Sequence, residues 1–391
     1  MKALFCYDGP LKKDENGLYY DIVLNDRMFE RYFKVCDKLE LLIRVKNVKG
    51  DDIKGKMSQL TNPDISVTEC PNLASVSGMI KNTYKVKKIL EERIKTADLV
   101  FIRLPSTIGN HAVDCCRKLN KKYLIEVVGC PWDAYWNYSL KGKLAAPFAT
   151  YMMKKRIKSA SHVLYVTNEF LQSRYPTKGK TIPCSNVELQ PCESDALQKR
   201  FAKIDSYGDN TKYVIGTAAA LDVLYKGQQY VIEALGKLKE QGITCFEYQC
   251  IGGGSGERLK TVARECGVEE YVNIVGQLSH DKVFEWLTNI DFYIQPSRQE
   301  GLPRSVIEAM SRALPCLGAK TAGIPELINP SCVFSNSKKE PEEIAKLLCD
   351  MIKDKERMKK LAEENYNEAK KYERDTLIKR RTDFFKDYAQ V

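Results

Sequence analysis

Residues 291–310 read DFYIQPSRQEGLPRSVIEAM, and this stretch decides the fold. The apolar run at 291–297 predicts a buried strand, because strands of a parallel sheet are covered on both faces and carry nearly continuous apolar side chains. RSVIEAM then has helical spacing. Pro303 suits a first helical turn, where its missing N–H has no partner to lose, and Gly301 lets the backbone approach a ligand closely.

The same alternation of strand and helix continues in both directions. Apolar runs predict strands at 2–7, 39–45, 98–104, 122–128, 162–167, 213–219, 246–252, 271–276, 291–297 and 315–319. Helical spacing predicts helices near 84–96, 109–120, 227–241, 257–266, 281–289, 302–313, 340–353, 354–372 and 374–389. Strands that alternate with helices in this way form parallel sheets with helices on both faces.

The chain of 391 residues is long enough for two to three domains. A polar stretch at 192–212 separates two strand–helix series and reads as a linker. We therefore expect an α/β protein of two Rossmann-like, doubly wound parallel-sheet domains that face each other across a cleft. The expected ranges are 1–195 for the first domain and 196–373 for the second, with a last helix at about 374–391 that packs back on the first domain.

The positive charge lies in the first half. Residues 1–200 hold 34 Lys and Arg against 22 Asp and Glu, a balance of +12, and the remaining residues hold 28 against 29, a balance of −1. The halves therefore have different electrostatic tasks. We expect no nucleic-acid partner, because no recognised module is present and the second half offers no basic track.

The fourteen cysteines form no C-x-x-C pair, so a zinc ribbon or a redox motif is not expected. The first residues carry too short an apolar run for a signal peptide, and no segment reaches the 18 to 20 apolar residues that span a bilayer. We expect free thiols in a reducing, cytoplasmic location. The oligomeric state cannot be inferred.

Two carboxylates mark the predicted turn and helix. Glu300 stands just before the helix and Glu308 falls near its second turn. Free N–H groups at a helix start favour a phosphate, and the two acids could each accept hydrogen bonds from a sugar ring on either side of it. The simpler interpretation is a favourable acid at a helix start and an exposed acid on its surface.

Five motifs favour the first interpretation. The E-x7-E pattern from Glu300 to Glu308 is preceded by LDVLYKGQQYVIEAL, CIGGGSGERLK and VNIVGQLSHDKVFEWL, and followed by PCLGAKTAGIPELI. In this order they resemble the retaining glycosyltransferases of family 4, also called glycosyl transferases group 1. The resemblance covers most of residues 90–335 and implies the GT-B fold. Similar enzymes build bacterial surface polysaccharides.

The resemblance implies a role for each matching residue. Glu308 would hold the ribose hydroxyls of a nucleotide-sugar donor, for which we expect a UDP sugar, and Glu300 would contact the transferred hexose. Lys226 would neutralise the departing diphosphate, which is electrostatic catalysis by a preorganised cation. The backbone amides of Gly301 and Leu302 would cap the distal phosphate. Gly276 and Gln277 would belong to the loop that binds the base.

The chain departs from the family pattern in two places. An arginine usually precedes the lysine, but Ala220 or Leu221 fills that position. Arg298 or Arg304 could compensate, or either could be a plain surface charge. A histidine usually follows the strand that matches LIEVVG, but Val128 and Gly129 stand there, so the acceptor side is less defined. His111 and Arg103 are the candidates on that side.

The expected chemistry needs no metal and no cofactor beyond the donor substrate. No D-x-D motif is present, and the three histidines have no metal-ligand spacing. The resemblance implies same-face attack by the acceptor, so the two glutamates are not assigned the paired acid and nucleophile roles of glycosidases.

No acidic residue occurs between Asp133 and Glu169. This interval or its edge holds cations and aromatic side chains around a short apolar helix, a pattern typical of a segment that lies on a membrane surface. The expected contacts with anionic lipid are Trp132, Trp136, Lys154, Lys155 and Arg156. The alternative is that the apolar face is core and the cations are solvated.

The leading hypothesis is thus a retaining, metal-independent hexosyltransferase that acts on a glycan acceptor, with a lipid-linked glycan expected, and rests on the inner face of the cell membrane. The alternative is a sugar-nucleotide-binding or scaffold subunit with little catalysis, which the missing arginine supports. A Rossmann oxidoreductase is disfavoured, because GGGSGE at 252–257 lacks the full glycine fingerprint.

Overall fold

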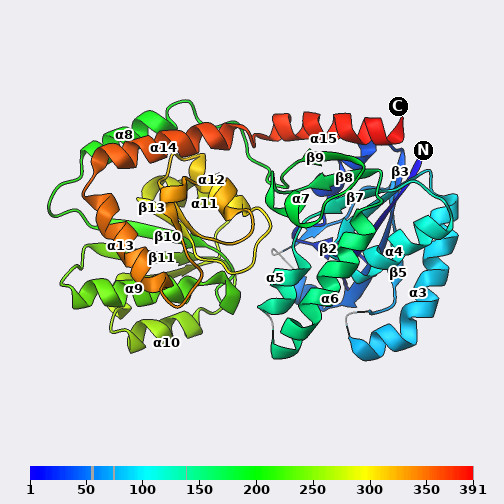
Figure 1. Cartoon of the computed structure of the whole chain (residues 1–391), viewed down its shortest axis with the longest axis horizontal. Helices are drawn as coiled ribbons and strands as arrows, with labels where there is room; N and C mark the ends of the chain where they lie inside the picture. Colours follow the sequence, from blue (N-terminus) through cyan, green and yellow to red (C-terminus); the bar gives the residue numbers. More distant parts are fainter. Residues whose placement is uncertain (54–56, 74, 138, 391) are drawn as a thin grey trace. The chain divides into compact units, whose positions relative to one another are not determined.

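The computed structural model describes residues 1–53, 57–73, 75–137 and 139–390, and these fall into two compact units (Figure 1). Unit 1 comprises Met1–Trp132, Leu144–Cys184 and Leu377–Val391, and unit 2 comprises Asp133–Lys143 and Ser185–Thr376. The long passage from unit 1 to unit 2 therefore begins at Ser185, ahead of the boundary at 195 that the sequence suggested.

Unit 1 is built on a nine-stranded sheet. Seven strands run parallel in the order β5-β3-β1-β6-β7-β8-β9, and β2 and β4 add an antiparallel extension to the far half of β1. The bounds are β1 (Lys2–Lys13), β2 (Tyr19–Asp21), β3 (Lys38–Asn47), β4 (Ser58–Gln59), β5 (Ile65–Cys70), β6 (Leu99–Leu104), β7 (Leu124–Val127), β8 (His162–Tyr165) and β9 (Lys180–Pro183).

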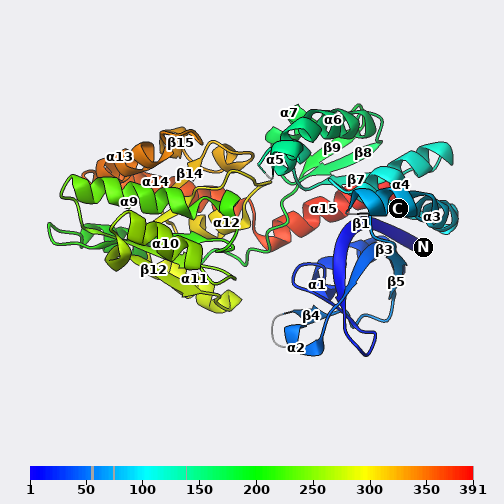
Figure 2. The same cartoon turned by 90° about the horizontal axis from the view of Figure 1, so that it is seen from below.

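The helices of the first part of the chain are α1 (Asp26–Phe29), α2 (Gly50–Ile53), α3 (Val76–Thr96), α4 (Thr107–Lys118), α5 (Pro131–Trp136), α6 (Leu140–Ile157) and α7 (Phe170–Arg174). Figure 2 shows α1, α2 and β4 gathered at the extended end of β1, away from α4. Strands β6 and β7 are buried along their whole length, as their continuous apolar runs require.

The last helix, α15 (Arg374–Ala389), is red in Figure 1 and packs on the unit 1 sheet. The Tyr388 hydroxyl accepts a hydrogen bond from the Val100 N–H at 3.0 Å, and the Phe385 ring lies 4.9 Å from that of Phe101. Residues far apart in the sequence thus complete one core.

Unit 2 has a six-stranded, all-parallel sheet in the order β12-β11-β10-β13-β14-β15. Its strands are β10 (Tyr213–Ala218), β11 (Phe246–Ile251), β12 (Val272–Gly276), β13 (Phe292–Gln295), β14 (Cys316–Ala319) and β15 (Val333–Phe334). Its helices are α8 (Ala196–Asp205), α9 (Gln228–Glu240), α10 (Glu257–Glu265), α11 (His280–Asn289), α12 (Arg304–Met310), α13 (Glu340–Ile352) and α14 (Lys355–Lys370).

All ten predicted strands exist, but continuous apolar runs did not identify every strand. Strand β5 exposes Ser66 and Glu69, and β9 is polar and exposed at its start, so neither shows a continuous apolar run. Strand β1 continues to Lys13, well past the predicted end at residue 7, because its second half pairs with β3 and β2. All fourteen cysteines are free thiols, and most are buried.

Candidate active site

The strand order of unit 2 reverses between β10 and β13, which are neighbours in the sheet. In open parallel sheets a ligand binds beyond the carboxyl ends of the strands, at the point where the order reverses. The loops that leave this point carry Lys226 after β10 and Glu300 after β13. The topology therefore brings together two residues that are 74 positions apart in the chain.

The two loops are fastened to each other. The Arg298 N–H donates to the Tyr225 carbonyl at 2.8 Å. Gly227 has a φ of +79°, and a Cβ atom there would collide with the Pro296 carbonyl. Only glycine accommodates this close approach, which sets Lys226 directly beside the 296–303 loop.

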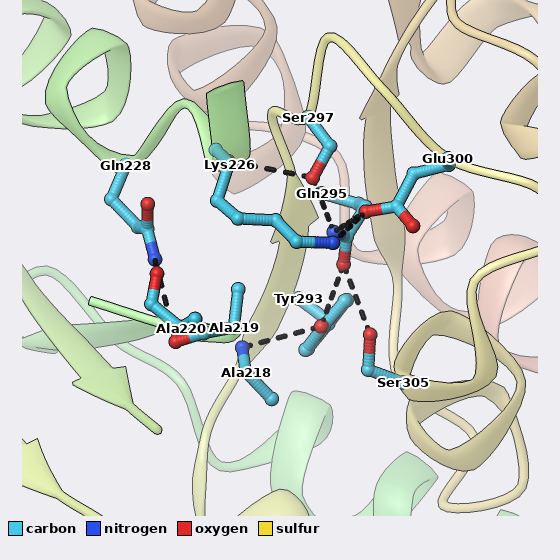
Figure 3. Close-up of polar contacts among 10 residues, drawn as sticks. All are labelled: Ala218, Ala219, Ala220, Lys226, Gln228, Tyr293, Gln295, Ser297, Glu300 and Ser305. Atoms are coloured by element: carbon cyan, nitrogen blue, oxygen red, sulfur yellow. Dashed lines mark hydrogen bonds and ion pairs between the residues drawn. The ribbon is translucent and has the colours of Figure 1, made fainter. Parts of the chain in front are cut away.

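Lys226 and Glu300 form an ion pair with 2.7 Å between Nζ and Oε1 (Figure 3). Their side chains are 22% and 12% exposed, so the pair is mostly withdrawn from water yet open on one side. A partly buried ion pair is screened less than a surface pair. The two predicted catalytic residues are thus in direct contact.

A buried polar network backs this pair. The Gln295 amide group lies between Glu300 and the hydroxyls of Tyr293 and Ser305, and the Ser297 hydroxyl lies beside it (Figure 3). The sequence reading missed this network, because Gln295 and Tyr293 look like ordinary strand residues in an apolar run.

A second buried amide holds the loop where the family arginine is missing. Gln228 is fully buried, and its Nε2 donates to the carbonyl of Ala220 at 3.2 Å. Ala220 is exposed and Leu221 is buried, so neither provides a cation. Another missed residue, Arg258 of α10, reaches this loop from the side and donates to the Gln229 amide oxygen at 3.2 Å.

Glu308 lies half-buried on α12, within the same unit. Burial raises the pKa of its carboxyl, and the nearby Arg304 partly offsets the effect. Among the residues that the structure describes, none forms an ion pair with Glu308. Arg304 itself is exposed at the first position of α12.

Arg298 is held by residues of two helices, and its expected replacement of the missing arginine stays a prediction. Its guanidinium stacks on the Tyr230 ring at 4.1 Å and pairs with Glu340 at 2.9 Å. Burial raises the pKa of Glu340 to about 7 even with this partner. Arg298 therefore contacts both α9 and α13, while its side chain remains 29% exposed.

The other predicted donor contacts lie at the same edge of the sheet. The Gly252 N–H donates to the Gly276 carbonyl at 2.8 Å, and the side chain of Gln277 lies beside Gly253. Gly301 accepts from the Gly323 N–H at 2.9 Å, and Leu302 is buried. The loops after β11, β12, β13 and β14 are thus held together by backbone contacts.

Asp222 fixes the glycine turn that the sequence predicted at 252–257. Its carboxylate accepts hydrogen bonds from the N–H groups of Ser255 at 2.8 Å and Gly256 at 3.0 Å. These bonds hold the pKa of Asp222 below its usual range. The carboxylate therefore joins the loop after β10 to the loop after β11.

In unit 1, Arg103 is a core residue, so the expectation that it contacts an acceptor is wrong. It is 5% exposed, and its guanidinium pairs with the buried carboxylate of Glu126 at 2.7 Å. His111 lies on α4, and burial lowers the pKa of its imidazole. Asp8 caps this helix by accepting from the Thr107 N–H at 2.6 Å. His111 stays a candidate on the acceptor side.

The predicted membrane residues divide into two groups. Lys154, Lys155 and Trp136 are exposed, as a surface contact requires. Arg156 is 8% exposed and pairs with Asp114 at 2.8 Å, so its assignment to a lipid contact is wrong. Trp132 is half-buried, with the Arg174 guanidinium over its ring.

Helix α6 also presents a stripe that the sequence could not separate from core. Leu140, Leu144, Phe148 and Tyr151 follow one face of the helix and are 80%, 85%, 69% and 62% exposed. In the described part of the chain, no helix is long and apolar enough to cross a bilayer.

Comparisons with known proteins agree with this geometry. The family model for glycosyl transferases group 1 matches residues 200–368. Protein CapJ of Staphylococcus aureus is 32% identical over 375 residues, which cover 95% of this chain and 90% of CapJ. The amylovoran biosynthesis glycosyltransferase AmsK of Erwinia amylovora is 38% identical over 110 residues, 26% of this chain and 27% of AmsK.

Among solved structures, HepE of Anabaena in complex with UDP-glucose superposes with a TM-score of 0.63 at 16% identity, covering 99% of this chain and all of that one. This likeness concerns the fold alone, which is the GT-B fold that the sequence motifs predicted. The match to CapJ extends over nearly the whole of both chains, and the family model covers the sheet that carries Lys226 and Glu300. The chain belongs to the glycosyl transferases group 1.

Proposed function

We propose that this protein is a retaining glycosyltransferase that moves a hexose from a UDP sugar to a lipid-linked glycan acceptor during synthesis of a surface polysaccharide. The observation that carries the proposal is the contact between Lys226 and Glu300 at the point where the strand order of unit 2 reverses. A scaffold that binds no sugar nucleotide would need neither a withdrawn cation nor a carboxylate beside it, and a subunit that only binds the nucleotide is distinguished by the absence of transfer.

The pair supplies the charge that transfer requires. Negative charge develops on the diphosphate as the bond to the sugar breaks, and a cation fixed in a partly buried site stabilises it more than a solvated cation would. Lys226 has that position, and Glu300 is placed to accept hydrogen bonds from the sugar hydroxyls. With Lys226 in this role, the leaving group needs no metal ion for its neutralisation.

The identity of the donor rests on relatives. HepE was solved with UDP-glucose, and AmsK is named for amylovoran biosynthesis. We infer a UDP sugar and a polysaccharide product from these names, together with the expected ribose contact at Glu308 and the base-binding loop at Gly276 and Gln277.

Isothermal titration calorimetry with UDP, GDP and ADP tests the donor site. The proposal expects UDP to bind with the highest affinity and this binding to weaken in Glu308→Ala. An NMR assay of the product then tests the transfer itself. We expect the anomeric carbon of the new linkage to keep the configuration that it has in the donor. Absence of binding by all three nucleotides, or a product of inverted configuration, would contradict the proposal.

The acceptor side is inferred from α6. Its exposed stripe is bordered by the exposed cations Lys141, Lys143, Lys154 and Lys155, and the segment carries no acidic residue. An apolar stripe with cations on its border fits the boundary of an anionic lipid layer, where each nearby cation contributes about 1 kcal/mol. The protein would then act at the cytoplasmic face of a membrane, where a lipid-linked glycan is accessible.

A further inference from the structure

Gln295 ends strand β13 with its side chain 1% exposed, and both ends of its amide are occupied. Its Oε1 accepts from the Tyr293 hydroxyl at 2.8 Å and from the Ser305 hydroxyl at 3.1 Å. Its Nε2 donates to the Ser297 hydroxyl at 2.7 Å and to Oε1 of Glu300 at 3.2 Å. A buried amide with four partners is a fixed group.

The orientation of this amide follows from its neighbours. Glu300 is an acceptor, so the amide nitrogen must face it, because an amide oxygen in that place would repel the carboxylate. The Tyr293 hydroxyl already accepts from the Ala218 N–H at 3.2 Å, and it donates its own proton to Gln295. Burial raises the pKa of Tyr293, so that proton stays in place at neutral pH.

The same amide reaches both members of the Lys226–Glu300 pair. It contacts Glu300 directly, and its second N–H engages Ser297, whose hydroxyl lies 3.4 Å from the Lys226 carbonyl. Figure 3 shows these groups converging from β13, the loop before α9 and the start of α12. One buried side chain thus connects the carboxylate of one loop to the backbone of the other.

We propose that Gln295 is the positioning residue of the donor site, which holds Glu300 in its sugar-binding orientation when Lys226 turns from Glu300 to the diphosphate. This inference rests on the proposed function. In the structure Lys226 and Gln295 both donate to the same oxygen of Glu300. When the phosphate draws Lys226 away, Gln295 remains to orient the carboxylate, while Ser297 keeps the lysine backbone in register.

The role predicts a specific pattern of affinities. Losing a hydrogen bond to a charged group typically changes an equilibrium about 10- to 100-fold. Gln295→Met, which keeps the length of the side chain, should weaken binding of the sugar nucleotide by about tenfold or more. It should leave the affinity for free UDP within about twofold, because UDP carries no hexose for Glu300 to hold.

The experiment is calorimetry with UDP, UDP-glucose, UDP-galactose and UDP-N-acetylglucosamine on wild type, Gln295→Met, Glu300→Ala and the double variant. The measured quantity is the ratio of the affinity for the preferred UDP sugar to the affinity for UDP. If Gln295 acts through Glu300, the double variant has the same ratio as Glu300→Ala. Independent, additive losses would overturn the inference, as would an unchanged ratio in Gln295→Met.

Asn365→Leu is the matched control for a buried amide. Asn365 is 3% exposed in the same unit and donates to the Leu314 carbonyl at 2.7 Å, far in sequence from the donor loops. This variant should lower thermal stability and leave the affinity ratio unchanged. An equal change of the ratio in Asn365→Leu and Gln295→Met would reduce Gln295 to a general structural role.

A measurement without ligand separates this inference from the proposed function. If wild type binds none of the nucleotides, the proposed function fails, and ligand-free crystal structures of Lys226→Ala and of Lys226→Ala with Gln295→Met still decide the positioning role. Without the lysine, Gln295 is the donor that remains on Oε1 of Glu300, so we expect the carboxylate to stay beside Gln295 in Lys226→Ala and to move away when Gln295→Met is added. A Glu300 carboxylate in the same place in both variants would overturn the role of Gln295.

Discussion

Arg298 and Glu340 are joined by an ion pair of 2.9 Å in which the carboxylate is completely buried. This pairing ties an arginine that lies two residues before Glu300 to helix α13. It also makes the stability of unit 2 depend on pH, because burial raises the pKa of Glu340 to about 7.

Glu340→Gln should remove this pH dependence. The unfolded chain ionises Glu340 near 4.5, while the folded chain keeps it protonated up to about 7. Its contribution to stability is therefore full below pH 4.5 and is lost as the pH rises to about 7, on the order of 1–3 kcal/mol. Denaturant unfolding of both proteins at pH 5 and pH 8 measures the difference. A parallel change in the two proteins would contradict the raised pKa.

Lys226→Ala should lower the rate of sugar transfer by about 100- to 1000-fold, the usual cost of removing one group that stabilises developing charge. UDP affinity should fall too, because the cation also meets the bound diphosphate. The measurement is UDP release from the donor with calorimetry in parallel. Lys260→Ala is the control, since Lys260 is an exposed partner of Glu257 on α10, and it should behave as wild type. Equal effects of the two variants would remove Lys226 from the catalytic role.

Glu308→Gln should change how UDP binding responds to pH. Burial raises the pKa of Glu308, so its carboxyl group loses its proton at a higher pH than usual. The ionised carboxylate is a better acceptor for ribose hydroxyls. UDP affinity of wild type should therefore rise with pH more steeply than that of the variant. Titrating both proteins between pH 5 and pH 8 cancels the ionisation of UDP itself. Identical profiles would mean that Glu308 does not touch the nucleotide.

Leu144→Ser combined with Phe148→Ser should abolish sedimentation with vesicles rich in anionic lipid. Lys154→Ala with Lys155→Ala should weaken it and make the remaining binding less sensitive to salt, since Lys141 and Lys143 remain. The matched control replaces Lys34 and Lys38, two exposed lysines elsewhere in unit 1, by Ala. Recruitment of wild type by neutral vesicles to the same extent would refute the electrostatic part of the proposal.

Arg156→Ala should affect the stability of unit 1 and not its binding to lipid. Its guanidinium is buried against Asp114 and the Asn110 carbonyl, so its loss should destabilise unit 1 by about 1–3 kcal/mol. Vesicle binding of the folded fraction should not change. Thermal unfolding and sedimentation on the same sample distinguish this outcome from a lipid-contact role, in which stability would be retained and binding reduced.

The sequence was sufficient for the parallel architecture, because apolar runs and helical spacing are local patterns. The family resemblance selected Lys226 and Glu300, which the structure brings into contact, and the roles of Lys226, Glu300 and Glu308 stay predictions. The sequence could not predict the environment of Arg298, Arg103 or Arg156, because the same residue type can be solvated or can pair with a buried carboxylate. The partner decides, and Glu340, Glu126 and Asp114 are each distant in the chain. Gln295 was missed for the same reason, since its four contacts come from tertiary packing.

Helix α15 has a consequence for the order in which the protein matures. Residues 377–389 complete the core of unit 1, yet they leave the ribosome after the whole of unit 2 has been made. Until then the rings of Phe101 and Tyr32 lack their neighbour Phe385. Since domains generally fold as units during synthesis, the second unit can reach its native state first, while the first keeps an open apolar face until α15 has been synthesised.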